Sequence, residues 1–487
     1  MIRGLLKSVG LAKSSPPSTR VIRAFFDSAK TTTRNARKWA GASGVSADAA
    51  ADVEARRVLR NRSRYIVSNS SIAAGIIDTY ANDVIGTGPR LQMTGEISSK
   101  DARRVEREFA RWSEAVSLGQ KLSIAVQSLV TSGEVFVLLA SNPGVKNAVV
   151  FDLRLVEADQ VASPYEDAMT SIFDDGVDGI VYDIYGNPTA YSVLRDHPGS
   201  NTLTGRFLEA AKIPADRVIH LYKPTRPGQS RGVPWITPAL DRFNALDAFV
   251  QATVDAAETS ARLPMFIYSD QAAEDGEGVD PDANEVIELQ PGEALTLPAG
   301  WKVGQLKQEH PTTTFPAFRA EIIKDVARCL GMPLNIAAGD SSGYNYSSGR
   351  LDHQTYYKAI GVVQKMIERI VLNRVFDRWL SIATLVDGLL PQSLRTTNAD
   401  TDHSWFWDGV GHVDPLKEAN AERVRLESGT GTLSEIYARQ GKDWETQLEQ
   451  RARERDKLEE LGLLGPSFED EGVGADDPEE EEEVSDE

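Results

Sequence analysis

Residues 226–235 read RPGQSRGVPW, a decapeptide that holds two prolines and two glycines. Prolines fix φ and glycines allow turns, so we expect a rigid connector here and a change of architecture across it. Immediately after the connector, Thr237 is placed to cap a helix and Pro238 to occupy its first position. The pattern predicts a helix over residues 238–262 that ends before Pro264 and is about 37 Å long at 1.5 Å per residue.

The chain before the connector alternates between helical and strand patterns. Apolar residues recur every three or four positions over residues 49–85, 101–115 and 122–130, which predicts helices. Short β-branched runs bounded by turn residues predict strands at 134–139, 149–153, 179–185, 190–194 and 218–222. Together these patterns predict one α+β domain over residues 40–225.

The chain after the connector is expected to hold a small β unit between two helices. Strand-like runs at 265–268, 286–289 and 294–297 follow the first helix. A helical pattern over residues 315–330 then closes the unit. The two flanking helices can therefore lie side by side.

A flexible loop is expected at residues 334–350, because three glycines and four serines fall within it. A long helix is predicted to follow over residues 351–385, where apolar residues stay in register.

The C-terminal part is predicted to be mainly helical. A short strand is expected at 405–407, and helices are expected from Pro415 and over residues 442–462. Thr432 and Glu435 have the spacing of a capping box, in which each side chain accepts the other residue's backbone N–H.

Charge is concentrated at the two ends of the chain. The net charge at pH 7 is −19, and 12 of the acidic residues lie within residues 469–487, which hold no Lys or Arg. Residues 1–38 carry nine Lys and Arg against one acid, Asp27. The basic end is either a solvated arm or a binder of phosphates or of an acidic partner, and the acidic end is either a solubilising tail or a docking peptide for a basic partner.

The composition excludes several classes of site. A length of 487 residues suits about three domains. The single cysteine, Cys329, excludes intrachain disulfides and a Cys-rich metal site, and no two histidines have the i, i+4 spacing of a zinc helix. The phosphate-binding glycine motifs of nucleotide enzymes are absent, and no apolar run approaches the roughly 18 residues of a membrane span. We therefore expect a non-enzymatic protein that has no metal or cofactor and is not exported.

Two patterns keep other functions open. Residues 339–343 read GDSSG, which matches the G-x-S-x-G elbow of a serine hydrolase with Ser341 as nucleophile. That elbow needs a strand before the turn, whereas a helix and a proline are expected here. A helix–turn–helix over residues 432–444 would suit a sequence-specific DNA-binding protein, although Arg439 and Lys442 give it little basic character.

Four separated blocks are similar to signatures of the lambda family of phage portal proteins. The first two are NSSIAAGIID with NDVIGTG (residues 69–78 and 82–88) and the connector RPGQSRGVPW. The third, NYSSGR (345–350), resembles the family's tunnel-loop motif, and the fourth runs from WFWD (405–408) to VDPLKEA (413–419). These blocks span most of the chain.

The resemblance implies an α+β protein with a portal-type fold, which has an α+β wing, a helical stem, a small β-rich clip and an α-helical C-terminal crown and is assembled as a ring. Such rings usually have twelve subunits. The implied division is a basic N-terminal arm (1–39), the wing (40–225), the connector and first stem helix (226–262), the clip (263–312), the second stem helix (313–333), the tunnel loop (334–350), a wing helix and return strand (351–413), crown helices (414–466) and a disordered acidic tail (467–487).

The resemblance also implies a function and partners. A portal ring occupies one vertex of a tailed-phage capsid, where terminase packages double-stranded DNA through it and from where the DNA exits. The implied partners are further copies of the chain, the terminase large subunit, the major capsid or scaffolding protein, a head–tail connector protein and DNA bound without sequence preference. The implied location is the virion, with the host cytoplasm during assembly, and no membrane partner or cofactor is implied.

A DNA conduit must not hold DNA tightly, because every phosphate that is neutralised by Lys or Arg adds affinity and therefore drag. The helix over 238–262 carries more acidic than basic residues. Its candidates for lining the channel are Asp241, Asp247, Asp255 and Glu258. The candidates for DNA contact in the tunnel loop are Asn345, Tyr346, Ser347, Ser348 and Arg350.

Overall fold

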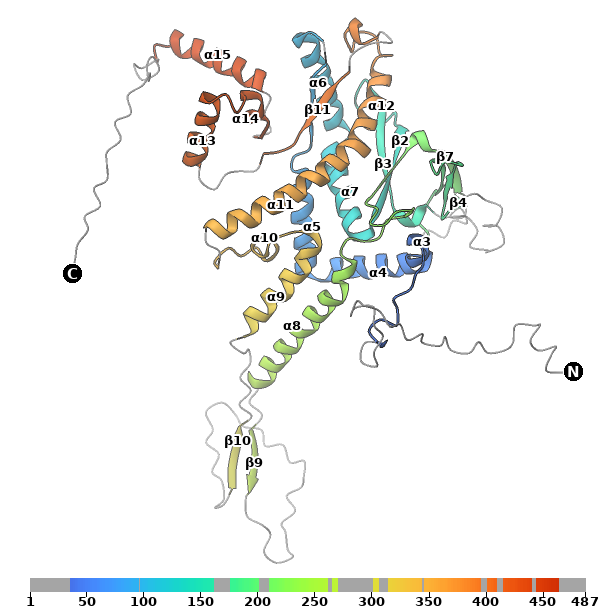
Figure 1. The fold of residues 1–487 in the computed structure, drawn as a ribbon, viewed down its shortest axis with the longest axis vertical. Coiled ribbons are helices and arrows are strands. Elements are labelled where there is room, and N and C mark those ends of the chain that lie inside the picture. The colour runs from blue at the N-terminus through green and yellow to red at the C-terminus, as the bar shows by residue number, and fades with distance from the viewer. Residues whose placement is uncertain are drawn as a thin grey trace, which may run out of the picture.

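The computed structural model describes residues 36–95, 97–161, 176–200, 210–261, 265–269, 301–305, 314–343, 346–395, 401–409, 415–439 and 444–463. A body of helices and sheets carries two helices that project from one end (Figure 1). The predicted strands at 286–289 and 294–297, most of the basic arm and the acidic tail lie outside the described residues.

Four helices form the first part of the body. They are α4 (Val53–Asn69), α5 (Ser71–Ile85), α6 (Ser99–Ala115) and α7 (Leu118–Ser132), and a short helix, α3 (Ala47–Ala50), precedes them. They confirm the predicted helices. The break between α4 and α5 falls at Ser70, which adopts an extended backbone with φ −108° and ψ 117°. The carboxylate of Asp52 accepts the backbone N–H of Ala55 at 2.8 Å and caps α4.

Two antiparallel sheets complete the body, and the three-stranded one packs against α7. The three-stranded sheet has the order β3 (Phe151–Val156), β2 (Glu134–Ser141), β8 (Val218–Tyr222). The four-stranded sheet has the order β4 (Gly176–Val177), β5 (Ile180–Tyr182), β6 (Pro188–Leu194), β7 (Ala210–Pro214). The five strands predicted before the connector are all present, whereas β4 and β7 were not predicted because they are short or lack an alternating apolar pattern.

Aromatic side chains join the helices and sheets in the main core. Trp112 of α6 stacks on Phe151 of β3 with ring centroids 5.3 Å apart, and its indole N–H donates to the Phe151 carbonyl at 2.9 Å. Phe109 contacts Trp379 at 5.2 Å, so the same core includes the helices after residue 346. A smaller core lies between the two sheets, where Phe136 contacts Tyr191 at 5.7 Å.

The projecting pair consists of α8 (Leu240–Ala261) and α9 (Phe315–Ala327), with β9 (Met265–Ser269) and β10 (Trp301–Gln305) paired beyond their far ends (Figure 1). This arrangement agrees with the predicted β unit between two helices. The predicted cap on α8 is wrong: Thr237 lies in a 3₁₀-helix, Thr237–Ala239, and its hydroxyl donates to the Pro234 carbonyl at 2.6 Å. The connector continues into α8 through this 3₁₀ turn.

The expected loop at 334–350 is partly helical, which corrects the prediction. Helix α10 (Leu334–Ala338) occupies its start and ends at Gly339, whose φ of +64° suits glycine. Helix α11 begins at Tyr346, five residues before the predicted start at Leu351, and runs to Ile367. It continues through a π-helical segment, Glu368–Leu372, into α12 (Asn373–Ala383).

The C-terminal elements follow the predictions closely. Strand β11 (His403–Phe406) pairs with β1 (Arg90–Met93), a strand that was not predicted. Helices α13 (Pro415–Glu427), α14 (Leu433–Arg439) and α15 (Trp444–Glu460) follow. The capping box is confirmed, since the Thr432 and Glu435 side chains accept each other's backbone N–H at 3.2 and 3.3 Å.

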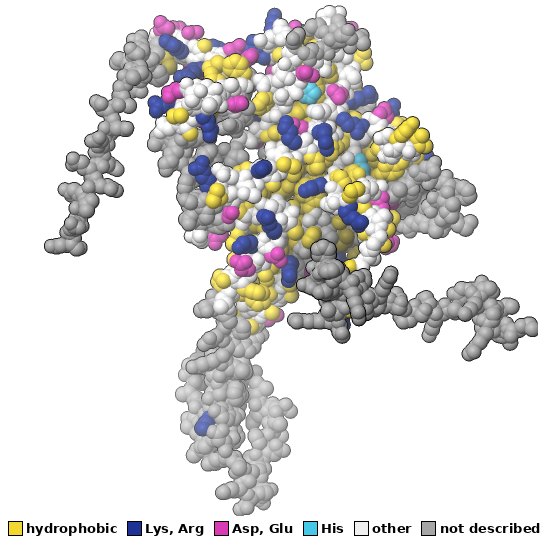
Figure 2. Space-filling view, viewed as in Figure 1, with side chains coloured by type: hydrophobic (Ala, Val, Ile, Leu, Met, Phe, Trp, Pro, Cys, Tyr) yellow, Lys and Arg dark blue, Asp and Glu magenta, His cyan; other side chains and the backbone are white. Residues whose placement is uncertain are grey.

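The surface of the body has no strong division of charge on the face drawn in Figure 2, where Lys and Arg side chains are scattered among apolar and acidic ones. None of the helices in the described parts of the chain is both long and apolar enough to span a bilayer.

Candidate functional site

The two projecting helices are antiparallel, and among their described residues they are joined by an ion pair and by contacts between aromatic rings. Arg242 of α8 lies 3.3 Å from Asp325 of α9, and both side chains are mostly exposed. Farther along, Phe249 contacts Phe315 at 5.5 Å and Phe318 at 4.8 Å between ring centroids. Only the first two turns of α8 enter the main body, where Phe243 and Leu246 are fully buried.

The four acidic candidates of α8 lie on the side of the helix that faces away from α9. At 100° per residue, Asp241, Asp247, Asp255 and Glu258 fall within an arc of about 120°. Arg242 and Phe249, which contact α9, lie on the other side. The structure therefore places the four carboxylates on one face, as a channel lining would require.

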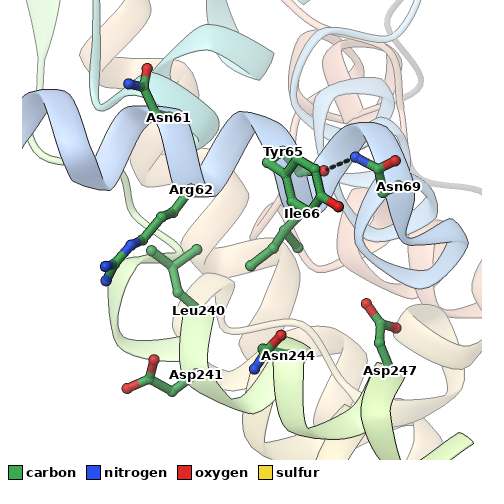
Figure 3. A pocket seen from close by; sticks show the side chains of 9 residues that line it. All are labelled: Asn61, Arg62, Tyr65, Ile66, Asn69, Leu240, Asp241, Asn244 and Asp247. Atoms are coloured by element: carbon green, nitrogen blue, oxygen red, sulfur yellow. Dashed lines mark hydrogen bonds between the residues drawn. The ribbon is translucent and has the colours of Figure 1, made fainter. Parts of the chain in front are cut away.

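Two of these carboxylates have hydrogen bonds that fix their direction. Asp247 accepts from the Ser70 hydroxyl at 3.3 Å, which ties α8 to the junction between α4 and α5. Asp255 accepts from the Gln251 side chain at 2.8 Å within α8. Asp241 and Asp247 also line a cleft between α4 and α8 (Figure 3).

Four of the five tunnel-loop candidates lie in a helix. Tyr346, Ser347, Ser348 and Arg350 lie in the first turns of α11, and Arg350 is exposed, whereas Asn345 lies outside the described residues. The side-chain amide of Asn335 in α10 is 2.8 Å from His353 Nε2 in α11, so the two helices are joined across the loop. Helix α10, which precedes these residues in the sequence, packs against α9.

A buried arginine in the connector holds α8 in place, and sequence reasoning missed this role. Arg231 is 1 % exposed, and its guanidinium makes two-pronged contacts of 2.8 and 3.0 Å with Glu134, the first residue of β2, which is fully buried. Its remaining N–H groups donate to the carbonyls of Ala158, Val161 and Asp178 at 2.6–3.0 Å. The connector is therefore joined to both sheets by one side chain.

Glu134 stays ionised in this cluster. Burial alone would raise its pKa, but the charge of Arg231 and a 2.9 Å hydrogen bond to His220 outweigh burial and hold the pKa well below its usual range. Glu134 also accepts the Gly232 N–H at 2.9 Å. Burial lowers the pKa of His220 although its contact with Glu134 acts in the opposite direction, so the imidazole is neutral.

Two glycines allow the connector to approach the start of β2. Gly133 has a φ of +87°, and a Cβ there would lie less than 3.0 Å from the backbone of Val233. A Cβ on Gly232 would lie equally close to the Gly133 carbonyl. Any larger residue would separate the two backbones, so both positions require glycine.

Two other blocks of the sequence meet in space although 321 residues separate them. Asp408 accepts from the Thr87 hydroxyl at 2.8 Å and from Arg90 at 2.9 Å, next to the pairing of β1 with β11. A Cβ on Gly86, whose φ is +56°, would overlap the Asp408 side chain. The IGTG and WFWD motifs thus form one structural unit.

A family model matches the part of the chain that contains the connector and the IGTG motif. The sequence model of the family described as "Phage portal protein, lambda family" matches residues 32–364, more than half of the chain. The chain belongs to the lambda family of phage portal proteins. Portal proteins are structural components of virus particles. The connector and the IGTG block lie inside the matched range, whereas the WFWD block lies beyond its end.

Curated relatives match between about half and nearly all of the chain. A probable portal protein of Halomonas phage phiHAP-1 is 26 % identical over 485 residues, which cover 93 % of this chain and 90 % of the relative. Portal protein B of Escherichia phage lambda is 20 % identical over 460 residues, and the match covers 83 % of this chain and 84 % of that protein. The portal protein of Escherichia phage N15 is 21 % identical over 285 residues, which cover 51 % of this chain and 52 % of that protein.

Similar solved structures come from gene transfer agent particles. A chain in the neck of the native particle, computed with C12 symmetry, is 15 % identical with a TM-score of 0.43, and the match covers 82 % of this chain and 95 % of that one. A chain in the neck of the empty particle, computed with C6 symmetry, has the same identity and TM-score, with coverages of 77 % and 91 %.

The geometry around Ser341 differs from that of a hydrolase elbow. Ser341 lies between α10 and α11, not between a strand and a helix, and Asp340 accepts the Ser342 N–H at 2.9 Å, as in an ordinary turn. This hydrogen bond holds the pKa of Asp340 below its usual range. His353 is engaged by Asn335. The portal family therefore accounts for the GDSSG loop better than catalysis does.

The helix pair α14–α15 lacks the basic face of a DNA-reading motif. Helix α15 carries six acidic and four basic residues, and one of the acids, Glu449, pairs with Arg103 of α6. The pair therefore packs against the body through charge, and it does not present a recognition helix of basic residues.

Proposed function

We propose that copies of this chain close into a ring, usually of twelve subunits, whose central channel conducts double-stranded DNA during packaging and exit. The observation that carries this proposal is the antiparallel α8–α9 pair, which projects from the body and is followed by the β9–β10 pairing, in a chain of the portal family (Figure 1). In this assembly α8 and α9 form the stem and β9–β10 belongs to the clip. Residues 40–225 with α11 and α12 form the wing, and α13–α15 form the crown.

The surface of the stem supports contact with further copies. Val254 of α8 and Phe318 of α9 are large apolar side chains that stay exposed in a single subunit. A closed ring uses the same two different surfaces on every subunit, so each stem is covered by its neighbours. Exposed apolar residues along a thin projection are what such an interface would bury.

The acidic face of α8 suits a channel wall. DNA phosphates are repelled by the carboxylates of this face, Asp241, Asp247, Asp255 and Glu258. The wall therefore displaces no counterions from the DNA, and the DNA binds it weakly. We place this face toward the bore. The first turn of α11, with Tyr346, Ser347, Ser348 and Arg350, and the preceding Asn345 form the narrower contact with DNA, in which the uncharged residues act as bumpers.

The remaining partners belong to the same proposal. The clip and the outer stem serve as docking surfaces for the terminase large subunit during packaging and for a head–tail connector protein afterwards. The wing contacts the major capsid or scaffolding protein at the capsid vertex. Assembly takes place in the host cytoplasm, and no cofactor takes part.

Imaging of the purified full chain in negative stain tests the ring. We expect annular particles with a central hole. A chain that stays monomeric at every protein and salt concentration would overturn the proposal.

A packaging assay tests the wall. The variant Asp255→Lys/Glu258→Lys is expected to slow DNA passage several-fold at low salt, because two new phosphate contacts per subunit add affinity, and less so at high salt. The control Glu114→Lys/Asp377→Lys changes the charge equally at exposed positions of the body. Equal effects from both variants would contradict the assignment of this face to the bore.

The same assay tests the tunnel-loop residues. Replacing Tyr346 and Ser347 by glycine is expected to impair packaging or DNA retention while rings still form. Loss of rings in these variants would show that the segment acts in assembly and would contradict this division of roles.

A further inference from the structure

A cleft of about 480 Å³ separates α4 from α8 on the surface of the subunit. Figure 3 shows side chains from both helices around it, with those of α4 above and those of α8 below. The residues that line it are Asn61, Arg62, Tyr65, Ile66 and Asn69 of α4 and Leu240, Asp241, Asn244 and Asp247 of α8. A space of this size would accommodate several side chains of a peptide.

The cleft combines an apolar floor with an acidic lower rim. Ile66 and Leu240 form the floor, and the ring of Tyr65, which is 70 % exposed, extends it (Figure 3). Asp241 and Asp247, both exposed residues, stand on the α8 side against a single cation, Arg62. This chemistry favours a segment that carries apolar side chains next to arginines.

The apolar surface continues from the cleft toward the start of α4. Val58 is 40 % exposed and precedes Tyr65 by seven residues, so the two side chains lie on the same face of α4. The described chain begins at residue 36, shortly before α3 and α4. A segment that precedes residue 36 can therefore follow this face of α4 to reach the cleft.

The segment of the required chemistry that lies nearest in sequence to residue 36 is found at residues 20–27. Residues 20–27 read RVIRAFFD and place Val21, Ile22, Phe25 and Phe26 beside Arg20 and Arg23. We propose that this segment of the basic N-terminal arm occupies the α4–α8 cleft of its own chain. Its apolar side chains cover Tyr65, Ile66 and Leu240. Its arginines pair with Asp241 and Asp247, which takes these two carboxylates out of the proposed channel wall and leaves Asp255 and Glu258 to face the bore.

The length of the arm allows this placement within one chain. Ten residues from position 26 to position 36 extend to about 33 Å. Tyr65 lies twelve residues beyond Val53, which is about 18 Å along α4. The extended length of the arm exceeds the distance along α4, so docking in the same subunit is compatible with its reach, and the proposal does not depend on ring formation.

Disulfide cross-linking in the full chain tests the location. With Cys329 replaced by serine, the pair Ala24→Cys and Asn244→Cys is expected to form a bond within one chain. The matched control pairs Ala24→Cys with Ala252→Cys, an exposed position of α8 about 12 Å farther along and outside the cleft. We expect cross-linking at least ten-fold faster in the cleft pair. Equal rates would overturn the docking, and a ladder of linked chains would overturn the assignment to the same chain.

Charge reversal tests the arginine contacts in the same assay. Asp241→Lys/Asp247→Lys is expected to slow the cross-link several-fold at low salt, and adding Arg20→Glu/Arg23→Glu is expected to restore it. The cross-linking rate of each charge variant is compared with that of the control cysteine pair carrying the same charge changes, which shows any general change in the mobility of the arm. A rate that does not respond to either change would overturn the charge pairing.

Discussion

Two arginine–carboxylate ion pairs position α8: one lies in the connector that precedes the helix, and the other joins the helix to α9. The two pairs differ in burial and in the number of their hydrogen bonds. At the connector, Arg231 and Glu134 have exposed fractions of 1 % and 0 %. On the stem, Arg242 and Asp325 have exposed fractions of 64 % and 63 %. The first pair has no water to replace it if it is broken, whereas the second is solvated on all sides.

The difference teaches which part of the molecule is rigid before assembly. The connector is fixed to both sheets by a fully hydrogen-bonded guanidinium and by two glycines that permit close backbone contact. The stem beyond Leu246 is held by surface contacts and exposed apolar side chains. The body therefore sets the direction of α8, and the far stem acquires its final stability from neighbouring copies in the proposed ring.

Removing the buried guanidinium is expected to have the largest effect. Arg231→Met removes the two-pronged partner of the buried Glu134 and leaves only the longer contact of 3.7 Å with the buried Arg60 as an ion pair in the described residues. We expect the free energy of unfolding to fall by about 3–5 kcal/mol. Arg231→Lys keeps the charge but not the two-pronged geometry and should fall between this variant and the wild type. Urea denaturation measures both. A loss below about 1 kcal/mol for Arg231→Met would remove the basis of the comparison.

Inserting a methyl group between the connector and the start of β2 is expected to reduce the free energy of unfolding by nearly as much. Gly133→Ala forces a Cβ into the backbone of Val233 at a left-handed φ, and we expect a loss of roughly 2–4 kcal/mol. Gly186→Ala is the matched control, because Gly186 has a φ of +84° but no neighbour within 4 Å of the added Cβ. That variant should lose only about 1 kcal/mol, the cost of the backbone conformation alone. Equal losses in thermal unfolding would show that the close approach contributes nothing.

The sequence allowed the periodic elements to be predicted but not the contact that joins them. Helices such as α8 and strands such as β2 have one buried face, so their apolar spacing reveals them. Arg231 stands between Ser230 and Gly232 in a segment rich in turn residues, where a charged side chain normally faces solvent. Its partner, Glu134, is 97 residues away in the sequence, and a single sequence contains no signal that pairs them.

The candidate site shows the same limit. The acidic face of α8 could be predicted because it follows from helical spacing alone. The start of α11 could not, because Tyr346 to Arg350 contain Gly and Ser residues that are typical of a loop, and the contact of Asn335 with His353 is tertiary. The unpredicted β1 likewise depends on a partner, β11, more than 300 residues later.

Acid is expected to weaken the connector before the stem. The pKa of His220 in the folded chain lies below its value of about 6.5 in the unfolded chain. The contribution of neutral His220 to the free energy of unfolding is therefore fully present above about pH 6.5. It is lost as the pH falls below that value, because the unfolded chain binds a proton that the folded chain does not. Glu134, whose folded pKa is also lowered, adds a second loss below about pH 4.3.

The variant His220→Gln isolates the first of these losses. An amide at this position can still donate to Glu134 but does not titrate. We expect the free energy of unfolding of the wild type to decrease more steeply between pH 7 and pH 5.5 than that of the variant. Parallel curves would assign the acid sensitivity to other histidines.

The stem pair is expected to show the smallest effect. Arg242→Ala removes an ion pair whose members are both about two-thirds exposed, and we expect the isolated subunit to lose at most about 1 kcal/mol, with less loss at high salt. The reversed pair Arg242→Asp/Asp325→Arg should restore the wild-type value, because only the sign of each charge has changed. A loss in Arg242→Ala as large as that in Arg231→Met would mean that α8 and α9 form a rigid unit without neighbours. The far stem would then need no ring to order it, and the contrast between the two ends of α8 would disappear.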